Sequence, residues 1–266
     1  MIAFFFGYLY FRKHYKIPKT GSMVCVTGGV KSGKSTFSFA VAYSQYKRNR
    51  RQVVIANIFR KLFSRELLEM PLFYSTVPVA VPHVLVTEEL LLRTERFRYK
   101  SVIWVDEASL LADSMSYKDG DINERLMLFN KLIAHETHGG CIVYNSQAIG
   151  DLHYSIKRCL SETFYVHSTF KWLPFFLLVT VREERYSEDG SVINAYTEDV
   201  ETSLKRVIIP KSTWKKFDCY CYSSMTDNLP VNANVVTADS LKAKCITSFN
   251  PRHSGEIDNE KGGFKK

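Results

Sequence analysis

A short glycine-rich segment between an apolar run and a helix-forming stretch constrains this chain more than any other feature. Residues 28–35 match the pattern G-x-x-x-x-G-K-[S/T] at every required position. The apolar run at 23–27 is typical of a buried strand, and the stretch that begins at Thr36 is typical of a helix. Strand, glycine loop and helix in this order form the context in which the pattern binds phosphates. The sequence therefore predicts an α/β fold that binds a nucleoside triphosphate. The alternative is that residues 28–35 are a glycine-rich turn that matches the pattern by chance.

Each residue type in this loop has a chemical reason. Glycines at both ends let backbone N–H groups point at a phosphate, and the start of the following helix adds its positive dipole end. Lys34 can reach the β- and γ-phosphates of ATP, and the hydroxyl of Ser35 is a ligand for Mg²⁺. The predicted ATP-binding residues are Gly28, Gly29, Val30, Lys31, Ser32, Gly33, Lys34, Ser35 and Thr36.

Two carboxylates close a second apolar run. Residues 101–106 are typical of a buried strand, and Asp106 and Glu107 stand at its carboxyl end, where ligands bind in open α/β sheets. Asp106 is placed to hold Mg²⁺ through water, and Glu107 to polarise the attacking water as general base. An adjacent Asp-Glu pair favours hydrolysis over transfer to a small-molecule acceptor. A strand end that happens to carry two acids is the alternative interpretation.

Polar residues after a further strand are candidates for sensing and turnover. The run 141–145 predicts a strand between the two already described, and a polar side chain at its end could contact the γ-phosphate. Gln147 is the favoured candidate and Asn145 the next, with a simple turn residue as the alternative. Arg158, ahead of Arg125, is the candidate for a catalytic finger that completes a neighbouring subunit's site. For both arginines an ordinary surface position is the competing interpretation.

Strands and helices alternate up to residue 168, which predicts a parallel sheet flanked by helices on both faces. Beyond it, runs at 175–184 and 191–198 predict an appended β-hairpin, and a short helix is expected at 211–217. The segment 71–86 carries three prolines and is expected to be irregular, with a strand fragment at most. The other expected strands are 52–57 and 163–167, and the other expected helices are 62–70, 88–96, 121–139 and 151–160.

Composition bounds the class of protein. The chain has 266 residues, 45% of them hydrophobic, and a net charge of +9, a balance that suits nucleic acid or an anionic membrane surface as partner. Basic clusters lie at 12–16, 47–51 and 215–216, and a solvated face is the plain interpretation of each. None of the six cysteines forms a C-x-x-C pair, so the spacing of a zinc site is missing and a reducing, intracellular compartment is indicated.

The N-terminus has an unusual order of apolar and basic residues. Residues 2–11 are almost wholly apolar and are followed at once by the basic cluster 12–16. The run is too short to cross a bilayer, which takes about 20 residues. A signal peptide would place its charges first. Two interpretations stay open: an anchor on a membrane surface through residues 2–16, and a strand or helix packed on the domain.

The order of the motifs along the chain resembles that of one family. The motifs are the phosphate loop, Asn57-Ile58 at the end of an expected strand, Asp106-Glu107, His138-Gly139-Gly140 before the strand that ends in Ser146-Gln147, the helix Asp151–Arg158, and Trp214–Asp218 with Tyr222-Ser223. Together they resemble the Zot family, the zonula occludens toxin-like ATPases that filamentous phages use in morphogenesis. The resemblance covers residues 20–225, as a P-loop ATPase domain. Residues 1–19 are then an N-terminal segment, and 226–266 a C-terminal extension that is partly disordered.

The resemblance implies ATP hydrolysis with Mg²⁺ by a ring-shaped homo-oligomer, taken as a hexamer, among DNA pumps of the FtsK/HerA type. The motor would serve assembly or extrusion of single-stranded DNA virions at the cytoplasmic face of the host's inner membrane. Single-stranded DNA and phage coat or assembly proteins would be its partners.

This chain departs from the family in two ways. It has Glu136-Thr137 where members commonly carry a basic residue, and it shows no apolar span after the ATPase domain. Two other functions stay open: an ATP-dependent scaffold or switch with little turnover, and a small-molecule kinase with Arg93, Arg96 and Arg98 as a weak lid.

Overall fold

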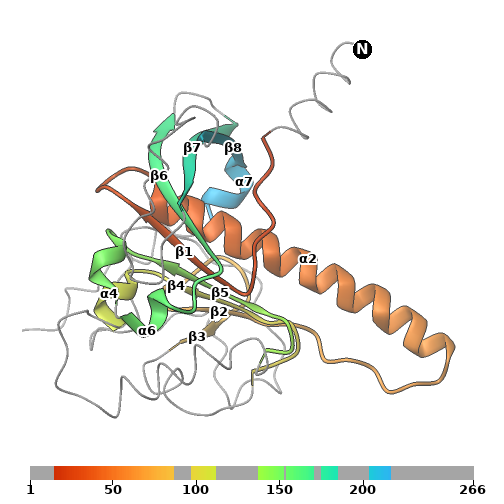
Figure 1. The fold of residues 1–266 in the computed structure, drawn as a ribbon. Coiled ribbons are helices and arrows are strands. Elements are labelled where there is room, and N and C mark those ends of the chain that lie inside the picture. The colour runs from red at the N-terminus through yellow and green to blue at the C-terminus, as the bar shows by residue number, and fades with distance from the viewer. Residues whose placement is uncertain are drawn as a thin grey trace, which may run out of the picture.

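The structure is a computed structural model, and it describes residues 15–86, 97–111, 137–152, 154–170, 175–184 and 204–216. Its strands are β1 (Met23–Gly28), β2 (Phe73–Ser75), β3 (Val84–Leu85), β4 (Val102–Val105), β5 (Cys141–Asn145), β6 (Glu162–Phe170), β7 (Phe176–Glu184) and β8 (Leu204–Pro210). Its helices are α2 (Lys34–Leu62), α4 (Ala108–Leu111), the 3-10 turn η1 (Ile149–Asp151), α6 (Tyr154–Lys157) and α7 (Lys211–Trp214). The described strands form one sheet in the order β3-β2-β4-β5-β1-β6-β7-β8 (Figure 1).

The sheet is mostly parallel. The pairs from β3 through β6 all run parallel, whereas β7 pairs antiparallel with both β6 and β8. This arrangement confirms the predicted α/β class with appended antiparallel strands. It also confirms that β5 lies between β1 and β4. The expected hairpin partner at 191–198 lies outside the described residues, and the strand that pairs with β7 is β8.

Side chains of the central strands alternate between two buried layers, as the two-residue period of a strand requires. Val24 and Val26 of β1 join the layer that contains the buried face of α2. Met23 and Cys25 join the opposite layer, together with residues of α4 and α6. Burial raises the pKa of the Cys25 thiol to about 12, so this cysteine is an unreactive core residue. Helices therefore cover both faces of the sheet.

The predicted strand at 52–57 and the helix at 62–70 are both wrong. Residues 52–57 belong to α2, a single helix of 29 residues that includes Asn57 and Ile58. The run of β-branched residues suggested a strand, but no glycine or proline interrupts the chain between Gly33 and Pro71. Propagation of an existing helix outweighs the small β preference of such residues. After α2 the chain folds back, because the Asn57 side chain donates to the Leu68 carbonyl (2.9 Å) and accepts from the Leu68 N–H (2.8 Å).

The strand next to β4 comes instead from the proline-containing segment. That segment forms the two short strands β2 and β3, close to the expected fragment. The helix expected at 151–160 is shorter than expected, since only η1 and α6 form there. The helix expected at 88–96, residues 121–136 of the helix expected at 121–139, residues 2–14 of the N-terminal segment and the extension after 225 lie outside the described residues. Residues 137–139 form a turn before β5 and are not helical. No helix of the described ranges is both long and apolar enough to span a bilayer.

Candidate nucleotide-binding site

Two glycines give the loop between β1 and α2 its shape. Gly28 ends β1 with φ of 156°, and a Cβ there would lie 2.8 Å from the Val166 carbonyl oxygen. Gly33 stands directly before α2 with φ of 94°, and a Cβ there would lie 2.1 Å from the hydroxyl of Thr169. Side chains at these positions would clash as well as strain the backbone. The loop is therefore a cradle that only glycines permit, as the predicted phosphate site requires.

Thr169 was not anticipated from the sequence. Strand β6 pairs with β1 as far as Val166 and continues beyond it after an irregularity between Val166 and Ser168. The extra length brings the Thr169 hydroxyl to the loop, where it donates a hydrogen bond to the Ser32 carbonyl. A threonine in an ordinary strand carries no sequence signal for such a role, since the contact depends on sheet order. Thr169 thus braces the loop next to Gly33.

Lys34 and Glu107 face one another across the site. Lys34 is the first residue of α2 and is only 8% exposed. Its Nζ lies 3.8 Å from Oε1 of Glu107. Glu107 is the second residue after β4, next to Asp106, and has φ of 50°, a left-handed conformation that is uncommon for a residue with a side chain. The sharp turn at the strand end brings the general-base candidate next to the lysine.

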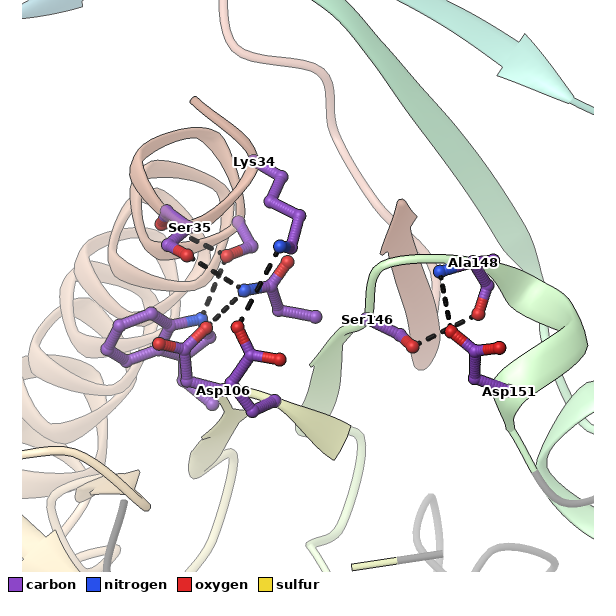
Figure 2. A network of polar contacts seen from close by, with 10 residues as sticks. Lys34, Ser35, Asp106, Ser146, Ala148 and Asp151 are labelled. Carbon is purple, nitrogen blue, oxygen red and sulfur yellow. Dashed lines mark hydrogen bonds and ion pairs between the residues drawn. The ribbon is translucent and has the colours of Figure 1, made fainter. Parts of the chain in front are cut away.

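Asn145 links the two predicted magnesium ligands. Its side-chain N–H donates to Oγ of Ser35 (3.0 Å) and to a carboxylate oxygen of Asp106. Burial raises the pKa of the Asp106 carboxyl, and the Asn145 hydrogen bond partly offsets this effect. The backbone N–H of Asp106 is itself held by the hydroxyl of Thr76 (2.9 Å). Figure 2 shows Ser35, at the start of α2, close to Asp106 at the end of β4.

The oxygen atoms in this cluster fit Mg²⁺. A hydroxyl and a carboxylate are hard oxygen donors of the kind that Mg²⁺ prefers. Oδ1 of Asn145 is buried and has no hydrogen-bond partner in the described part of the chain. This oxygen is a third possible donor in the cluster. Ser35 and Asp106 would hold the ion, as their residue types predict.

A buried hydrogen-bond chain ties β4 to the first turn of α2. The indole N–H of Trp104 donates to Oγ of Ser38 (3.1 Å), which donates to the Ser35 carbonyl (3.0 Å). Trp104 and Ser38 are both fully buried. The chain fixes the strand that carries Asp106 against the helix that carries Ser35.

The structure separates the two sensor candidates. The side chain of Gln147 is exposed, and its backbone carbonyl accepts a hydrogen bond from the Gly28 N–H (3.2 Å). Gln147 lies in a turn held by Ser146, Ala148 and Asp151, which Figure 2 shows beside the Lys34 cluster. Asn145, the second candidate, is the one bonded to magnesium-ligand candidates. A sensing role for Gln147 stays a prediction.

The structure says less about Arg158 and Arg125, the two candidates for the arginine finger. Arg158 is exposed in the turn after α6, where another molecule could reach it. Arg125 lies outside the described residues. Val30 and Lys31, at the tip of the loop, are exposed, and Lys31 has φ of 62°. The residues that the structure brings together are thus Lys34, Ser35, Asp106 and Glu107, joined by Asn145.

The described residues form a mostly parallel α/β sheet with the glycine loop between β1 and α2, which is the arrangement in which this loop pattern binds phosphates. By sequence, the chain matches no protein-family model and no curated protein. Among solved structures it is similar to the N-terminal domain of zonular occludens toxin from Neisseria meningitidis, with 14% identity and a TM-score of 0.40, over 75% of this chain and 100% of that chain. It is also similar to the genome packaging NTPase B204 from Sulfolobus turreted icosahedral virus 2 in complex with ATP-gammaS. For that structure the identity is 10% and the TM-score 0.35, over 71% of this chain and 98% of that chain. These values describe a distant likeness.

Proposed function

We propose that this chain is an ATPase that hydrolyses ATP to ADP and phosphate with Mg²⁺. One observation carries the proposal: Lys34, Ser35, Asp106 and Glu107 converge at the carboxyl ends of β1 and β4, joined by Asn145. Ser35 and Asn145, which are bonded to each other, are 110 positions apart in the chain. A phosphate loop, a magnesium-ligand pair and a carboxylate base are the parts that phosphoryl transfer to water requires.

Binding would begin at the loop. Its backbone N–H groups and the start of α2 attract the phosphates, and Thr169 holds the loop in shape. Lys34 is paired with Glu107 at 3.8 Å, so bound β- and γ-phosphates would compete for the lysine. Once Lys34 turns to the phosphates, the carboxylate of Glu107 is available to a water molecule.

Hydrolysis would then use Glu107 as the base. The oxygen of water attacks the γ-phosphorus while a proton of that water passes to the Glu107 carboxylate. The bond between the γ-phosphorus and the bridging oxygen breaks, and ADP keeps the electron pair. Mg²⁺, when bound, neutralises charge on the β- and γ-phosphate oxygens. Asn145 orients Ser35 and Asp106 toward one point, because its amide bonds both.

The biological role we propose is a motor for filamentous phage morphogenesis. It would act in assembly or extrusion of single-stranded DNA virions at the cytoplasmic face of the host's inner membrane, as a ring-shaped homo-oligomer. The order of motifs over residues 20–225 supports this role. The exposed position of Arg158 is compatible with a finger that acts on a neighbouring subunit.

ATP turnover with and without single-stranded DNA, together with the native mass in ATP, tests the proposal. Lys34→Ala should lose at least about 2 kcal/mol of ATP-binding free energy, the scale of a charge-assisted contact, and nearly all turnover. Lys19→Ala, at an exposed lysine of the same chain, is the matched control and should behave as the parent.

The alternatives give different results. Unchanged binding of a labelled ATP analogue by Lys34→Ala would remove the site assignment. Tight ATP binding with negligible turnover in the parent would identify a scaffold or switch. ADP release that depends on a small-molecule acceptor would identify a kinase. DNA-independent turnover by a monomer would contradict the motor role and leave the ATPase intact.

A further inference from the structure

The outer half of α2 carries a dense set of exposed apolar side chains. Seven of the eleven large apolar side chains that are exposed in the described part of the chain lie between residues 54 and 67. They are Val54, Ile55, Ile58, Phe59, Leu62, Phe63 and Leu67. Their exposed fractions run from 44% to 72%. Scattered apolar residues on a surface are ordinary, but this concentration on one segment indicates an interaction surface.

These side chains point away from the sheet. Val53 is the last buried residue of α2, and it marks the face that packs on the core. With 3.6 residues per turn, Leu62 lies about 180° and Ile58 about 140° around the helix from Val53. Figure 1 shows the C-terminal part of α2 extending beyond the strands. The helix therefore has a packed face along its first half and an exposed apolar face along its second.

Basic residues adjoin the apolar side chains. Lys47, Arg50 and Arg51 line a shallow groove together with Val54 and Ile55. None of the 29 residues of α2 is an aspartate or glutamate. The surface formed by the exposed side chains of residues 47–62 is called here the outer surface of α2.

The fold adds charge to this surface from a distant segment. Lys216, after α7, lies with its Nζ 5.6 Å from the centroid of the Tyr43 ring, and Lys47 approaches the same ring at 4.6 Å. Two basic clusters that are far apart in the sequence thus meet beside α2. Burial lowers the pKa of Lys47, and the charges of Arg51 and Lys216 lower it further. Like charges held this close favour an anionic partner.

The combination of side chains selects among anionic partners. A second copy that docked through the same surface would bring two acid-free basic faces together, which repel. Nucleic acid would pair with the basic residues but would leave Ile55, Ile58 and Leu62 in water, because aliphatic side chains offer no stacking surface. An anionic bilayer satisfies both parts, since headgroups meet Lys and Arg while apolar side chains enter about 5–10 Å below them.

We propose that the outer surface of α2 lies on an anionic phospholipid bilayer. Ile55, Ile58 and Leu62 enter the interface, and Lys47, Arg50 and Arg51 bind the headgroups. The surface is separate from the N-terminal segment 2–16, and it goes beyond the ATPase function. Lys34 begins the same helix, so the ATP site and the bilayer would hold opposite ends of α2.

Co-sedimentation of the full chain with vesicles tests the proposal. The parent should bind vesicles of phosphatidylglycerol and phosphatidylethanolamine, and bind pure phosphatidylcholine vesicles at least about tenfold more weakly. The triple variant Ile55→Ser, Ile58→Ser, Leu62→Ser and the double variant Arg50→Gln, Arg51→Gln should each weaken binding to anionic vesicles by about tenfold or more. Phe175→Ser with Leu204→Ser is the matched apolar control, because both side chains are exposed elsewhere on the fold. Arg206→Gln is the basic control.

Other readouts keep the test decisive. Every variant should bind an ATP analogue as the parent does, which reports an intact fold. Should the triple variant misfold, Leu62→Trp gives a direct signal: the fluorescence emission of the added tryptophan should shift to the blue with anionic vesicles only.

A parent chain that does not bind anionic vesicles would overturn the proposal. A triple variant that binds anionic vesicles as strongly as the parent would also overturn it and would point to residues 2–16 as the membrane-binding segment. A lower native mass for the triple variant, with vesicle binding unchanged, would make the surface a subunit interface. Loss of single-stranded DNA binding by the double variant, with vesicle binding unchanged, would assign the surface to nucleic acid.

Discussion

The two halves of α2 have similar residue types but different surroundings. In the first half, Phe37, Phe39 and Ala40 are fully buried against the sheet, and Lys34 and Ser35 belong to the proposed ATP site. After Val53 no residue of the helix is buried, although aliphatic and aromatic residues are more frequent there than before it. The difference shows that tertiary contacts, and not composition, separate the buried part of the helix from its exposed part.

A pair of matched substitutions should show the largest contrast between the halves. Phe39 is buried among Tyr43, Phe73 and Trp104, with ring centroids 5.1–6.0 Å away, whereas Phe59 is 57% exposed. Phe39→Ala should lower the free energy of unfolding by about 3–5 kcal/mol because it leaves a cavity. Phe59→Ala should change it by less than about 0.5 kcal/mol. Urea denaturation measures both, and equal losses would mean that the outer half is packed in solution.

Catalysis should depend on the first half and the adjoining strand ends alone. Glu107→Gln should bind ATP normally and hydrolyse it at least about 100-fold more slowly, a barrier increase of about 2.7 kcal/mol, because the amide cannot accept the proton. Glu66→Gln, at an exposed glutamate after α2, is the control and should keep full turnover. Single-turnover rates and analogue binding separate the two effects. If binding and turnover fell together, Glu107 would be a structural residue or metal ligand.

Acid should weaken the packed region without a mutation. Burial lowers the pKa of His83 to about 4, and its Nδ1 donates to the Val81 carbonyl at 2.8 Å. The unfolded chain binds a proton near pH 6.5, so this contribution to stability is complete above that pH and is lost as the pH falls toward 4. Titration of His83 should therefore make the free energy of unfolding about 2 kcal/mol lower at pH 5 than at pH 7. His83→Gln should show a smaller difference between these pH values, and an equal difference would show that His83 does not titrate there.

The smallest effect concerns the link between β4 and α2. Trp104→Phe removes the hydrogen bond to Ser38 and should cost about 1–2 kcal/mol of stability. Trp214→Phe is the matched control, since the indole N–H of Trp214 has no hydrogen-bond partner in the described residues and no bond is lost. Thermal melts of the two variants give the comparison. Equal melting temperatures would mean that the Trp104–Ser38 bond contributes nothing measurable.

Short local patterns in the sequence predict the chemistry of the candidate site. The glycine spacing at 28–35, with Lys34 and Ser35 at its end, predicts a phosphate loop because few other backbone paths need glycine at both places. The apolar run before Asp106 and Glu107 predicts a buried strand whose end reaches the same edge of the sheet. Both predictions are local, because neighbouring residues decide whether a short segment is a strand, a turn or a helix start. The parallel class of the fold followed from the same alternation.

Other features of the fold depend on contacts between residues far apart in the chain, and local sequence patterns do not predict them. Residues 52–57 continue the helix because cooperative extension of α2 outweighs their small preference for a strand. Thr169 reaches the loop because strand order places β6 beside β1, and Lys216 reaches the Tyr43 ring, near Lys47, because α7 packs beside α2. Asn145 is the last residue of β5, and its side chain bonds Ser35 in the candidate site. Gln147 lies in the turn that follows β5, and its side chain is exposed. The orientation of each of these side chains is set by packing against residues that are distant in the sequence.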